Sequence, residues 1–260
     1  MTGRTGVVIC GHGSREAGTV HEFAALVRDV AVRVPQYRME SGFLEYAAPT
    51  IQDGLEKLRR AGCARILVIP GTLFSAGHAQ QDIPSILRNF AADFPEVQIS
   101  YGRAFDVDTN FVRAACGRVR DAIDAAPGVI APEETALLVA ARGASDADVL
   151  ATMEAVTRLI QDDIKLASVQ TAYAGIALPR VPDVLEQIAA CSYKRVILLP
   201  YFLFTGMLVK RIYEQVDSIA ARYPATQFVK TSYLSNHPLV IDSFIARIDE
   251  TDRAGTVMNG

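Results

Sequence analysis

VVICGHGS, residues 7–14, is the stretch of sequence that decides the fold. Its apolar half is too short for a free-standing helix and ends in glycine, which is typical of a buried strand. His12 follows between two glycines that lack a Cβ, so the turn can be tight and a bulky ligand can approach the backbone. In an open α/β sheet, ligands bind just outside the carboxyl ends of the strands. We therefore expect His12 at the edge where such a sheet does its chemistry.

The pattern around this stretch occurs twice in the chain, at an offset of 130 residues. The offset aligns four stretches of the first half with four of the second: 8–13 with 138–143, 49–53 with 179–183, 66–70 with 196–200, and 73–74 with 203–204. A register kept over this length predicts two copies of one domain, residues 1–126 and 135–260. The linker between them, residues 126–135, carries prolines and a glycine that separate the two periodic patterns.

Strand and helix patterns alternate along both halves. Strands are expected near residues 7–9, 37–44, 65–70 and 97–101, and again near 136–140, 166–173, 195–200 and 227–231. Helices are expected near residues 15–34, 49–61, 78–94 and 108–125, and again near 146–163, 179–190, 208–222 and 237–248. This alternation predicts an α/β fold in which each half holds a four-stranded parallel sheet of right-handed βαβ units flanked by helices.

Composition and charge narrow the class of protein. A chain of 260 residues with 50% hydrophobic and 21% charged residues is typical of a globular protein. A net charge of −3 gives no reason to expect nucleic acid or an anionic membrane as a partner. No apolar run approaches the roughly 18 residues of a membrane span, and the first residues lack the apolar core of a signal peptide. We therefore expect a cytoplasmic protein without a membrane partner.

Three ionisable residues follow the first three predicted strands: His12, Glu45 and His78. In a sheet of strand order 2-1-3-4 these strand ends are neighbours, so two imidazoles and a carboxylate would line one edge. Such a set can hold a divalent transition metal or accept protons near neutral pH. The offset of 130 pairs these positions with Arg142, Gly175 and Leu208. Since only one half keeps the ionisable set, we expect a single active site.

Each of these residues also has a plainer interpretation. A lone loop histidine such as His12 is often a capping or surface residue, His78 could merely open a helix, and Glu45 could be a solvated carboxylate. Their joint placement at three strand ends of one edge favours a function. His21 lies within a predicted helix and His237 opens another, so both are expected to be structural or surface residues.

Several common catalytic motifs are absent from the sequence. There is no GxxxxGK[ST] phosphate loop, so coupling to nucleotide hydrolysis is not expected. GHGS lacks the full dinucleotide fingerprint, and no GxSxG elbow indicates an acyl hydrolase. Ser14 and Ser75 lie near the histidines in sequence, but no aspartate is placed to orient a histidine toward either hydroxyl. A serine nucleophile is therefore disfavoured.

Four motifs of the chain resemble those of the class II tetrapyrrole chelatases, and most of all the long, two-domain sirohydrochlorin cobaltochelatases and ferrochelatases. They are GHGSRE at 11–16, FLEYAAPTI at 43–51, IPGTLFSAGHAQQDI at 69–83 and SNHPLV at 235–240. The resemblance covers nearly the whole chain. It implies two tandem flavodoxin-like domains and ATP-independent insertion of a divalent metal into sirohydrochlorin, in the cleft between them. Such a lyase would serve cobalamin or sirohaem biosynthesis.

The resemblance also implies roles for individual residues. His12 and His78 stand where the family has its metal-binding, proton-accepting histidines, and Glu45 where it has its acidic residue. Co²⁺ is the metal expected first, and Fe²⁺ and Ni²⁺ suit the same ligands. Because the chain lacks a histidine-rich tract and a cysteine cluster, no iron–sulfur cluster is expected, and no nucleotide cofactor either. The sequence leaves open whether the protein is a monomer or a homodimer.

The residues expected to contact the tetrapyrrole come from both halves. Around the metal site these are Ser14, Ser75 and Phe74. In the second half, Arg142 replaces His12, and Lys210 and Arg211 replace Gln80 and Gln81, which predicts a clamp for the carboxylates of the substrate. Apolar walls for the flat macrocycle are expected from Leu73, Phe74, Leu203, Phe204 and Met207.

Two other functions remain open at this point. One is a carrier that binds a tetrapyrrole or a metal and delivers it without inserting the metal. The other is a flavodoxin-like protein that binds phosphate or another cofactor.

Overall fold

The computed structural model describes residues 4–74, 77–235 and 237–255, with the backbone alone for residues 77–80. It divides the chain into two compact units. The first unit runs through Asp106 and takes up the chain again from Val240, and the second unit is Val107–Leu239. Among the helices that the structure describes, none is long and apolar enough to cross a membrane.

The sheet of the first unit has four parallel strands in the order β2-β1-β3-β4. Their bounds are Gly6–Gly11 for β1, Arg38–Phe43 for β2, Arg65–Pro70 for β3 and Gln98–Tyr101 for β4. Cys10 pairs with Gly42 on one side and with Pro70 on the other. Therefore β1, β2 and β3 end at the same edge, as the predicted strand order requires.

The sheet of the second unit repeats this topology in the order β6-β5-β7-β8, again all parallel. The bounds are Thr135–Ala141 for β5, Ser168–Tyr173 for β6, Arg195–Pro200 for β7 and Gln227–Lys230 for β8. The predicted α/β fold with two four-stranded parallel sheets is confirmed.

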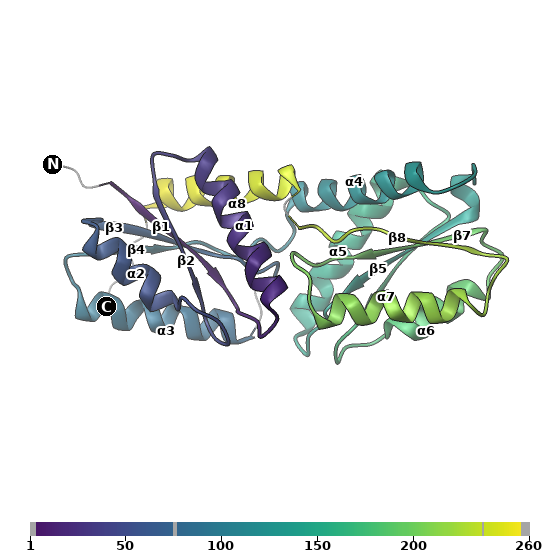
Figure 1. The fold of residues 1–260 in the computed structure, drawn as a ribbon, viewed down its shortest axis with the longest axis horizontal. Helices are drawn as coiled ribbons and strands as arrows, with labels where there is room; N and C mark the ends of the chain where they lie inside the picture. The colour runs from purple at the N-terminus through teal and green to yellow at the C-terminus, as the bar shows by residue number, and fades with distance from the viewer. Residues whose placement is uncertain (1–3, 75–76, 236, 256–260) are drawn as a thin grey trace. The chain divides into compact units, whose positions relative to one another are not determined.

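Helices cover both faces of each sheet. The first unit has α1 (Ala17–Arg33) and α8 (Pro238–Ala254) on one face, and α2 (Ile51–Arg60) and α3 (Gly77–Asp93) on the other (Figure 1). The second unit has α4 (Thr109–Ala125) and α5 (Ala147–Ile164) opposite α6 (Val181–Ala189) and α7 (Met207–Ala220). A short 3₁₀ turn, Pro132–Glu134, leads into β5.

The last helix of each repeat lies in the other unit. Helix α4 follows β4 along the chain but contacts α5, β7 and β8. Helix α8 returns to the first unit, where Glu250 pairs with Arg103 and the ring of Phe244 lies 4.7 Å from that of Phe105. The compact units therefore do not coincide with the predicted division into 1–126 and 135–260. A helical period shows which face of a helix is apolar, but not which sheet that face will cover.

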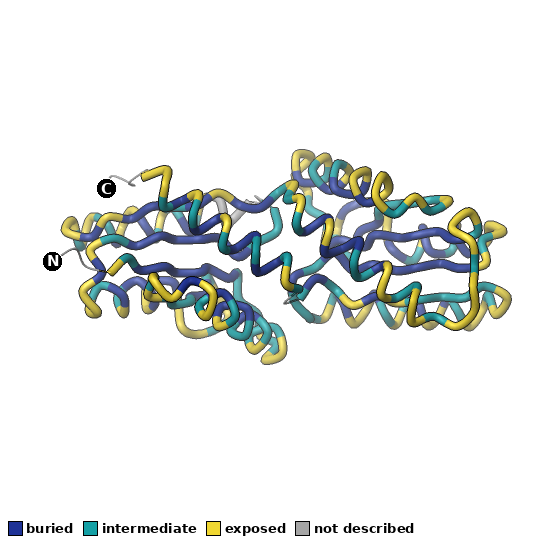
Figure 2. Tube along the Cα trace, turned by 90° about the horizontal axis from the view of Figure 1, so that it is seen from above, coloured by how far each residue is buried: buried dark blue, intermediate teal, exposed yellow. Residues whose placement is uncertain are grey.

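The strands form the core of each unit. Every residue of β1 and of β5 is buried, and buried segments run dark blue through both units in Figure 2. Val8 and Cys10 pack with Leu55 and Leu58 of α2 in one apolar cluster. Both leucines are fully buried, and burial of such a side chain stabilises a fold by about 1.5–3 kcal/mol. The loops that follow the strands are thus carried on a packed scaffold.

The start of α2 differs from the prediction that Pro49 opens this helix. The helix begins one residue after Thr50, whose hydroxyl accepts a hydrogen bond from the Asp53 backbone N–H. The Asp53 carboxylate accepts one from the backbone N–H of Thr50 in return, at 2.8 Å. This reciprocal capping box satisfies two backbone donors that would otherwise lack partners. Pro49 lies outside the helix, after a cis peptide bond with Ala48.

The exchange of the last helices can be tested with a matched pair of variants. Phe244 of α8 and Phe111 of α4 are both fully buried, and truncating a buried phenylalanine costs about 3–5 kcal/mol. We expect Phe244→Ala to accelerate amide hydrogen exchange mainly in β1–β4, and Phe111→Ala mainly in β5–β8. Hydrogen exchange followed by mass spectrometry measures this. The reverse pattern would show that each repeat keeps its own last helix.

Candidate functional site

His12 and Glu45 lie together at the carboxyl edge of the first sheet. They follow β1 and β2, and the pairing of these strands continues past their ends. The Leu44 N–H donates to the Gly11 carbonyl oxygen at 2.9 Å, and the Glu45 N–H to the His12 carbonyl oxygen at 3.0 Å. As a result, His12 Nε2 lies 3.1 Å from Glu45 Oε1, with side chains 38% and 42% exposed. Both groups can therefore reach a ligand from solvent.

Gly13 makes this approach of the two loops possible. Its φ is +98°, and a Cβ built on it would lie 1.7 Å from the carbonyl oxygen of Glu45. No side chain fits in that space, so only glycine lets the loop after β1 lie against the loop after β2. In the second unit Gly143, the counterpart of Gly13, also has a positive φ, +77°, but a Cβ on it would meet the side chains of Ala177 and Tyr173.

The expected third residue, His78, lies partly outside the described structure. Its backbone is the second residue of α3, but its side chain is not among the described residues, and Ser75 is outside them altogether. The loop that carries both leaves β3 at the same edge, since the Gly71 N–H donates to the Cys10 carbonyl oxygen at 2.7 Å. Within the described residues, no group of three or more His, Cys, Asp and Glu side chains could hold a metal ion.

Tyr46 and Arg15 extend the site beyond the residues singled out in the sequence. The Tyr46 ring meets the His12 ring edge-on, with centroids 6.3 Å apart and planes at 76°. On the same ring, the guanidinium carbon of Arg15 lies 5.1 Å from the centroid, a favourable cation–π distance. Both residues occur in quoted motifs, GHGSRE and FLEYAAPTI, but nothing in their spacing indicates that they would contact each other.

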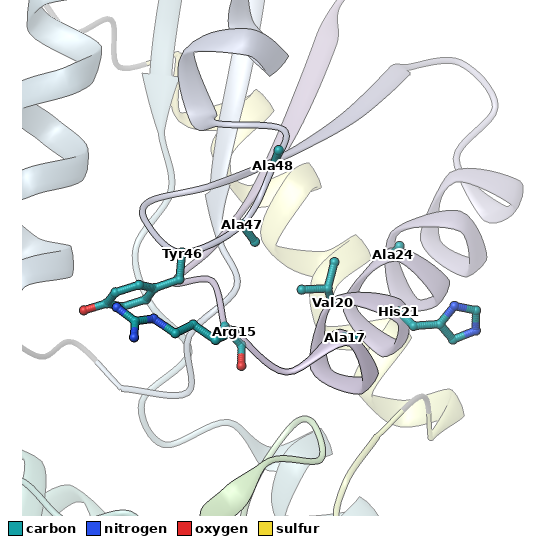
Figure 3. Close-up of a pocket in the computed structure, with 9 residues that line it drawn as sticks. Arg15, Ala17, Val20, His21, Ala24, Tyr46, Ala47 and Ala48 are labelled. Atoms are coloured by element: carbon teal, nitrogen blue, oxygen red, sulfur yellow. The ribbon is translucent and has the colours of Figure 1, made fainter.

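An open pocket of about 450 Å³ lies next to these residues within the first unit. Its polar lining includes Ser14, Arg15 and Tyr46, and its apolar lining is small: Ala17, Val20, Ala24, Ala47 and Ala48. Figure 3 shows Arg15 alongside the Tyr46 ring at one end, while the imidazole of His21 points away from them. The Ser14 hydroxyl oxygen accepts a hydrogen bond from the Glu16 N–H at 3.0 Å, which fixes the turn before α1.

The predicted cations of the second unit are all exposed. Arg142 comes directly after β5, and Lys210 and Arg211 lie near the start of α7, which follows β7. Helix α7 begins with Met207, and residues that begin a helix near a sheet's carboxyl edge are well placed for ligands. The structure therefore leaves all three cations accessible from solvent.

The apolar walls expected for a macrocycle are only partly right. Leu203 is 5% exposed and belongs to the core of the second unit, so it offers no surface. Leu73, Phe74 and Phe204 are half-buried, and Met207 is 68% exposed. Ile176 and Leu178, two further apolar residues not predicted from the sequence, follow β6 and are 72% and 70% exposed. The sequence contains an indication of this exposure, because two large apolar residues flank a small one in a loop next to a proline.

The thiol nearest to His12 in sequence takes no part in the site. Cys10 is fully buried, and burial raises the pKa of its thiol far above the usual value. A thiol that stays protonated is neither a metal ligand nor a nucleophile. Cys10 is thus the small buried residue of a core strand.

The model of the CbiX protein family matches two ranges of this chain, residues 6–122 and 136–251. The two matched ranges are the two sequence repeats. The sirohydrochlorin ferrochelatase of Bacillus subtilis (strain 168) is 31% identical over 246 residues, which cover 94% of this chain and 91% of that protein. The sirohydrochlorin cobaltochelatase of Priestia megaterium is 29% identical over 258 residues, covering 97% and 82%.

A solved structure described as SirB from Bacillus subtilis with Fe³⁺ has the same fold. It superposes with a TM-score of 0.84 at 30% sequence identity, and the match covers 95% of each chain.

The role of Gly13 leads to a prediction about metal binding. In Gly13→Ala the added methyl group must push the Glu45 backbone away, so Glu45 and His12 separate. We expect the affinity for Co²⁺ to fall by about tenfold or more, the equivalent of one lost ligand interaction of about 1.4 kcal/mol. Isothermal titration calorimetry with Co²⁺ measures this.

Gly62→Ala is the matched control for this variant. Gly62 has a similar φ of +83°, but a Cβ there would meet nothing within 4 Å. The Gly62→Ala variant therefore has the backbone strain but no steric clash, and it should bind Co²⁺ like the unmodified protein. Equal affinities of the two variants would contradict the proposed role of Gly13.

Proposed function

The chain belongs to the CbiX family, and from that premise we propose that it is a sirohydrochlorin chelatase, a lyase that inserts a divalent metal ion into the macrocycle. Iron and cobalt are the metals indicated by the names of its relatives. The observation that carries the proposal is the His12–Glu45 pair, an imidazole nitrogen and a carboxylate oxygen 3.1 Å apart at the ligand-binding edge of the sheet.

The separation of these two atoms suits a shared metal ion. Bonds from nitrogen and oxygen ligands to such ions are about 2.1 Å long, so two neighbouring ligands lie roughly 3.0–3.4 Å apart at tetrahedral or octahedral angles. The distance between His12 Nε2 and Glu45 Oε1 therefore allows both atoms to replace water molecules in the hydration shell of one metal ion. We propose His78 as the third ligand, because its helix begins directly beyond the same edge.

Metal insertion must also remove two protons from the pyrrole nitrogens. Once the metal has passed to the ring nitrogens, the neutral imidazole of His12 can accept one of these protons and the carboxylate of Glu45 the other. Because both side chains are partly exposed, a proton can pass from them to water. The metal and the protons move in opposite directions through the same pair of groups, and no nucleotide is needed.

We further propose that the second unit supplies the carboxylate clamp. Sirohydrochlorin carries several carboxylates, and Arg142, Lys210 and Arg211 are exposed cations near one edge of the second sheet. Cations in the first turns of a helix are disfavoured by the helix dipole, which argues for a functional reason at the start of α7. The exposed side chains of Ile176, Leu178 and Met207 suit the apolar face of a macrocycle.

The remaining expectations stay predictions. These are a cytoplasmic location, a monomeric or homodimeric state, the absence of nucleic-acid and membrane partners, and contacts of Ser14, Ser75 and Phe74 with the tetrapyrrole.

The catalytic pair is tested with purified protein, metal-free sirohydrochlorin and Co²⁺ or Fe²⁺, with the product followed by its absorption spectrum. We expect His12→Ala to lower kcat/KM by about 100-fold, the lower end of general acid–base contributions. Glu45→Gln should lose less activity and have a shifted pH profile.

Glu154→Gln is the control for the carboxylate substitution, because Glu154 lies on α5 and pairs only loosely with Arg158 at 3.7 Å. It should leave turnover unchanged. Tight binding of both sirohydrochlorin and metal without product would instead make the protein a carrier. Near-normal turnover of His12→Ala would remove His12 from the mechanism.

The clamp is tested by binding of metal-free sirohydrochlorin in the absence of any metal. Arg142→Ala should weaken this binding by about tenfold, as expected for a lost charge-assisted hydrogen bond, and leave the affinity for Co²⁺ alone unchanged. Binding of sirohydrochlorin by this variant should also depend less on salt concentration, because the variant lacks one of the charge pairs that salt screens. Arg158→Ala, an exposed arginine of the same unit, is the control. Equal affinities of the two variants would refute the clamp.

A further inference from the structure

The pocket beside His12 contains a cation that has no carboxylate partner. Several arginines of the first unit pair with carboxylates, among them Arg33 with Asp242, Arg59 with Glu56 and Arg103 with Glu250. In the part of the chain that the structure describes, Arg15 has no such pair, although it is exposed and lines the pocket. Among the described residues, its side chain contacts the ring of Tyr46. Its guanidinium donors are therefore available to an anion.

Tyr46 holds this arginine next to the metal site. Its backbone has a φ of +62°, a left-handed conformation that is uncommon for a bulky residue and is found preferentially at functional sites. In this conformation one ring contacts both the imidazole of His12 and the guanidinium of Arg15. The Tyr46 side chain thus sets the position of the cation relative to the candidate metal ligand.

The pocket next to this cation has the character of a site for a short aliphatic acid. Small apolar residues of α1 and of the loop after β2 form its walls, and Arg15 lies at one end (Figure 3). The Ser14 hydroxyl oxygen already accepts a backbone hydrogen bond, so its hydrogen can be donated to an anion. Methylene groups would pack on the alanines while a carboxylate receives hydrogen bonds from Arg15 and Ser14.

This arrangement belongs to the first unit only. At the offset of 130 residues, Ser14 and Arg15 correspond to Ala144 and Ser145, and Tyr46 corresponds to Ile176. The hydroxyl, the cation and the aromatic ring are therefore present where His12 and Glu45 are present, and absent where those two are absent.

We propose that this pocket binds one carboxylate-bearing side chain of the tetrapyrrole, with Arg15 and Ser14 as its binding residues and Tyr46 as a positioning residue. The proposal rests on the proposed function, since it names where one edge of that substrate is held. By fixing an acidic arm next to His12, the pocket fixes the rotation of the macrocycle about the metal site. It therefore sets which ring nitrogens face the metal.

The test compares Arg15→Gln, Ala17→Leu and two variants of Tyr46 in the full chain. We expect Arg15→Gln to raise the Kd for metal-free sirohydrochlorin and the KM by about 10- to 100-fold, the range of a lost charge-assisted hydrogen bond. Ala17→Leu fills the pocket without changing a charge, and it should also raise both the Kd for metal-free sirohydrochlorin and the KM. The Kd for Co²⁺ alone should stay within about twofold in both variants.

The two Tyr46 variants distinguish a positioning role of this residue from a general loss of structure. Tyr46→Phe keeps the ring and should retain the affinity for sirohydrochlorin, whereas Tyr46→Leu should weaken it like Arg15→Gln. Arg28→Gln is the charge-matched control, because Arg28 is exposed on α1, the helix that follows Arg15, but does not line the pocket. It should bind sirohydrochlorin like the unmodified protein.

The outcomes distinguish this proposal from the proposed function. If the unmodified protein inserts Co²⁺ into sirohydrochlorin while Arg15→Gln and Ala17→Leu keep normal Kd and KM, the pocket is not a substrate subsite and the chelatase function stands. If the unmodified protein neither binds nor metallates sirohydrochlorin, both proposals are overturned. A loss of Co²⁺ affinity in Arg15→Gln would also overturn the pocket proposal, because the residue would then act on the metal site.

Discussion

The site depends on one close backbone approach, that of the loop after β1 to the loop after β2. Strand pairing carries on into these loops through hydrogen bonds to the carbonyl oxygens of Gly11 and His12. It can do so because Gly13 has no Cβ to meet the Glu45 carbonyl oxygen. The buried strand β1 and its parallel neighbour β2 therefore deliver an imidazole and a carboxylate to the same point with little freedom of movement. Such preorganisation is what a metal site needs, since ligands that are already in place lose little entropy on binding.

The two repeats share this backbone arrangement and differ in the side chains placed on it. In the second unit the Gly175 N–H donates to the Arg142 carbonyl oxygen, as the Glu45 N–H donates to that of His12 in the first. One scaffold thus presents two ionisable groups with a stacked tyrosine and arginine, and the other presents cations and exposed apolar residues. The division of labour that we propose, metal handling with one substrate subsite in the first unit and the carboxylate clamp in the second, needs no change of fold.

The sequence predicted the sheets well because their signal is local. Short apolar runs ended by glycine or proline mark the strands, and the repeat offset supplied an internal check. The pairing of His12 with Glu45 followed from strand order alone. The contact of Tyr46 with Arg15 could not be predicted, since it depends on a left-handed backbone at Tyr46 and on where the chain turns into α1. The exchange of α4 and α8 between units was missed for a related reason: an apolar face does not specify its partner. Leu203 was misassigned because an apolar residue after a strand can turn into the core as readily as toward a ligand.

The most direct test of the account is a single-turnover experiment with the unmodified protein. Protein loaded with Co²⁺ is mixed with excess metal-free sirohydrochlorin, without any nucleotide, and the absorption spectrum is followed in a stopped-flow instrument. The account predicts a rapid phase that forms close to one equivalent of cobalt–sirohydrochlorin per chain, faster than free Co²⁺ reacts at the same concentration. Product formation no faster than with free Co²⁺, or a stable complex of protein, metal and tetrapyrrole without product, would contradict it.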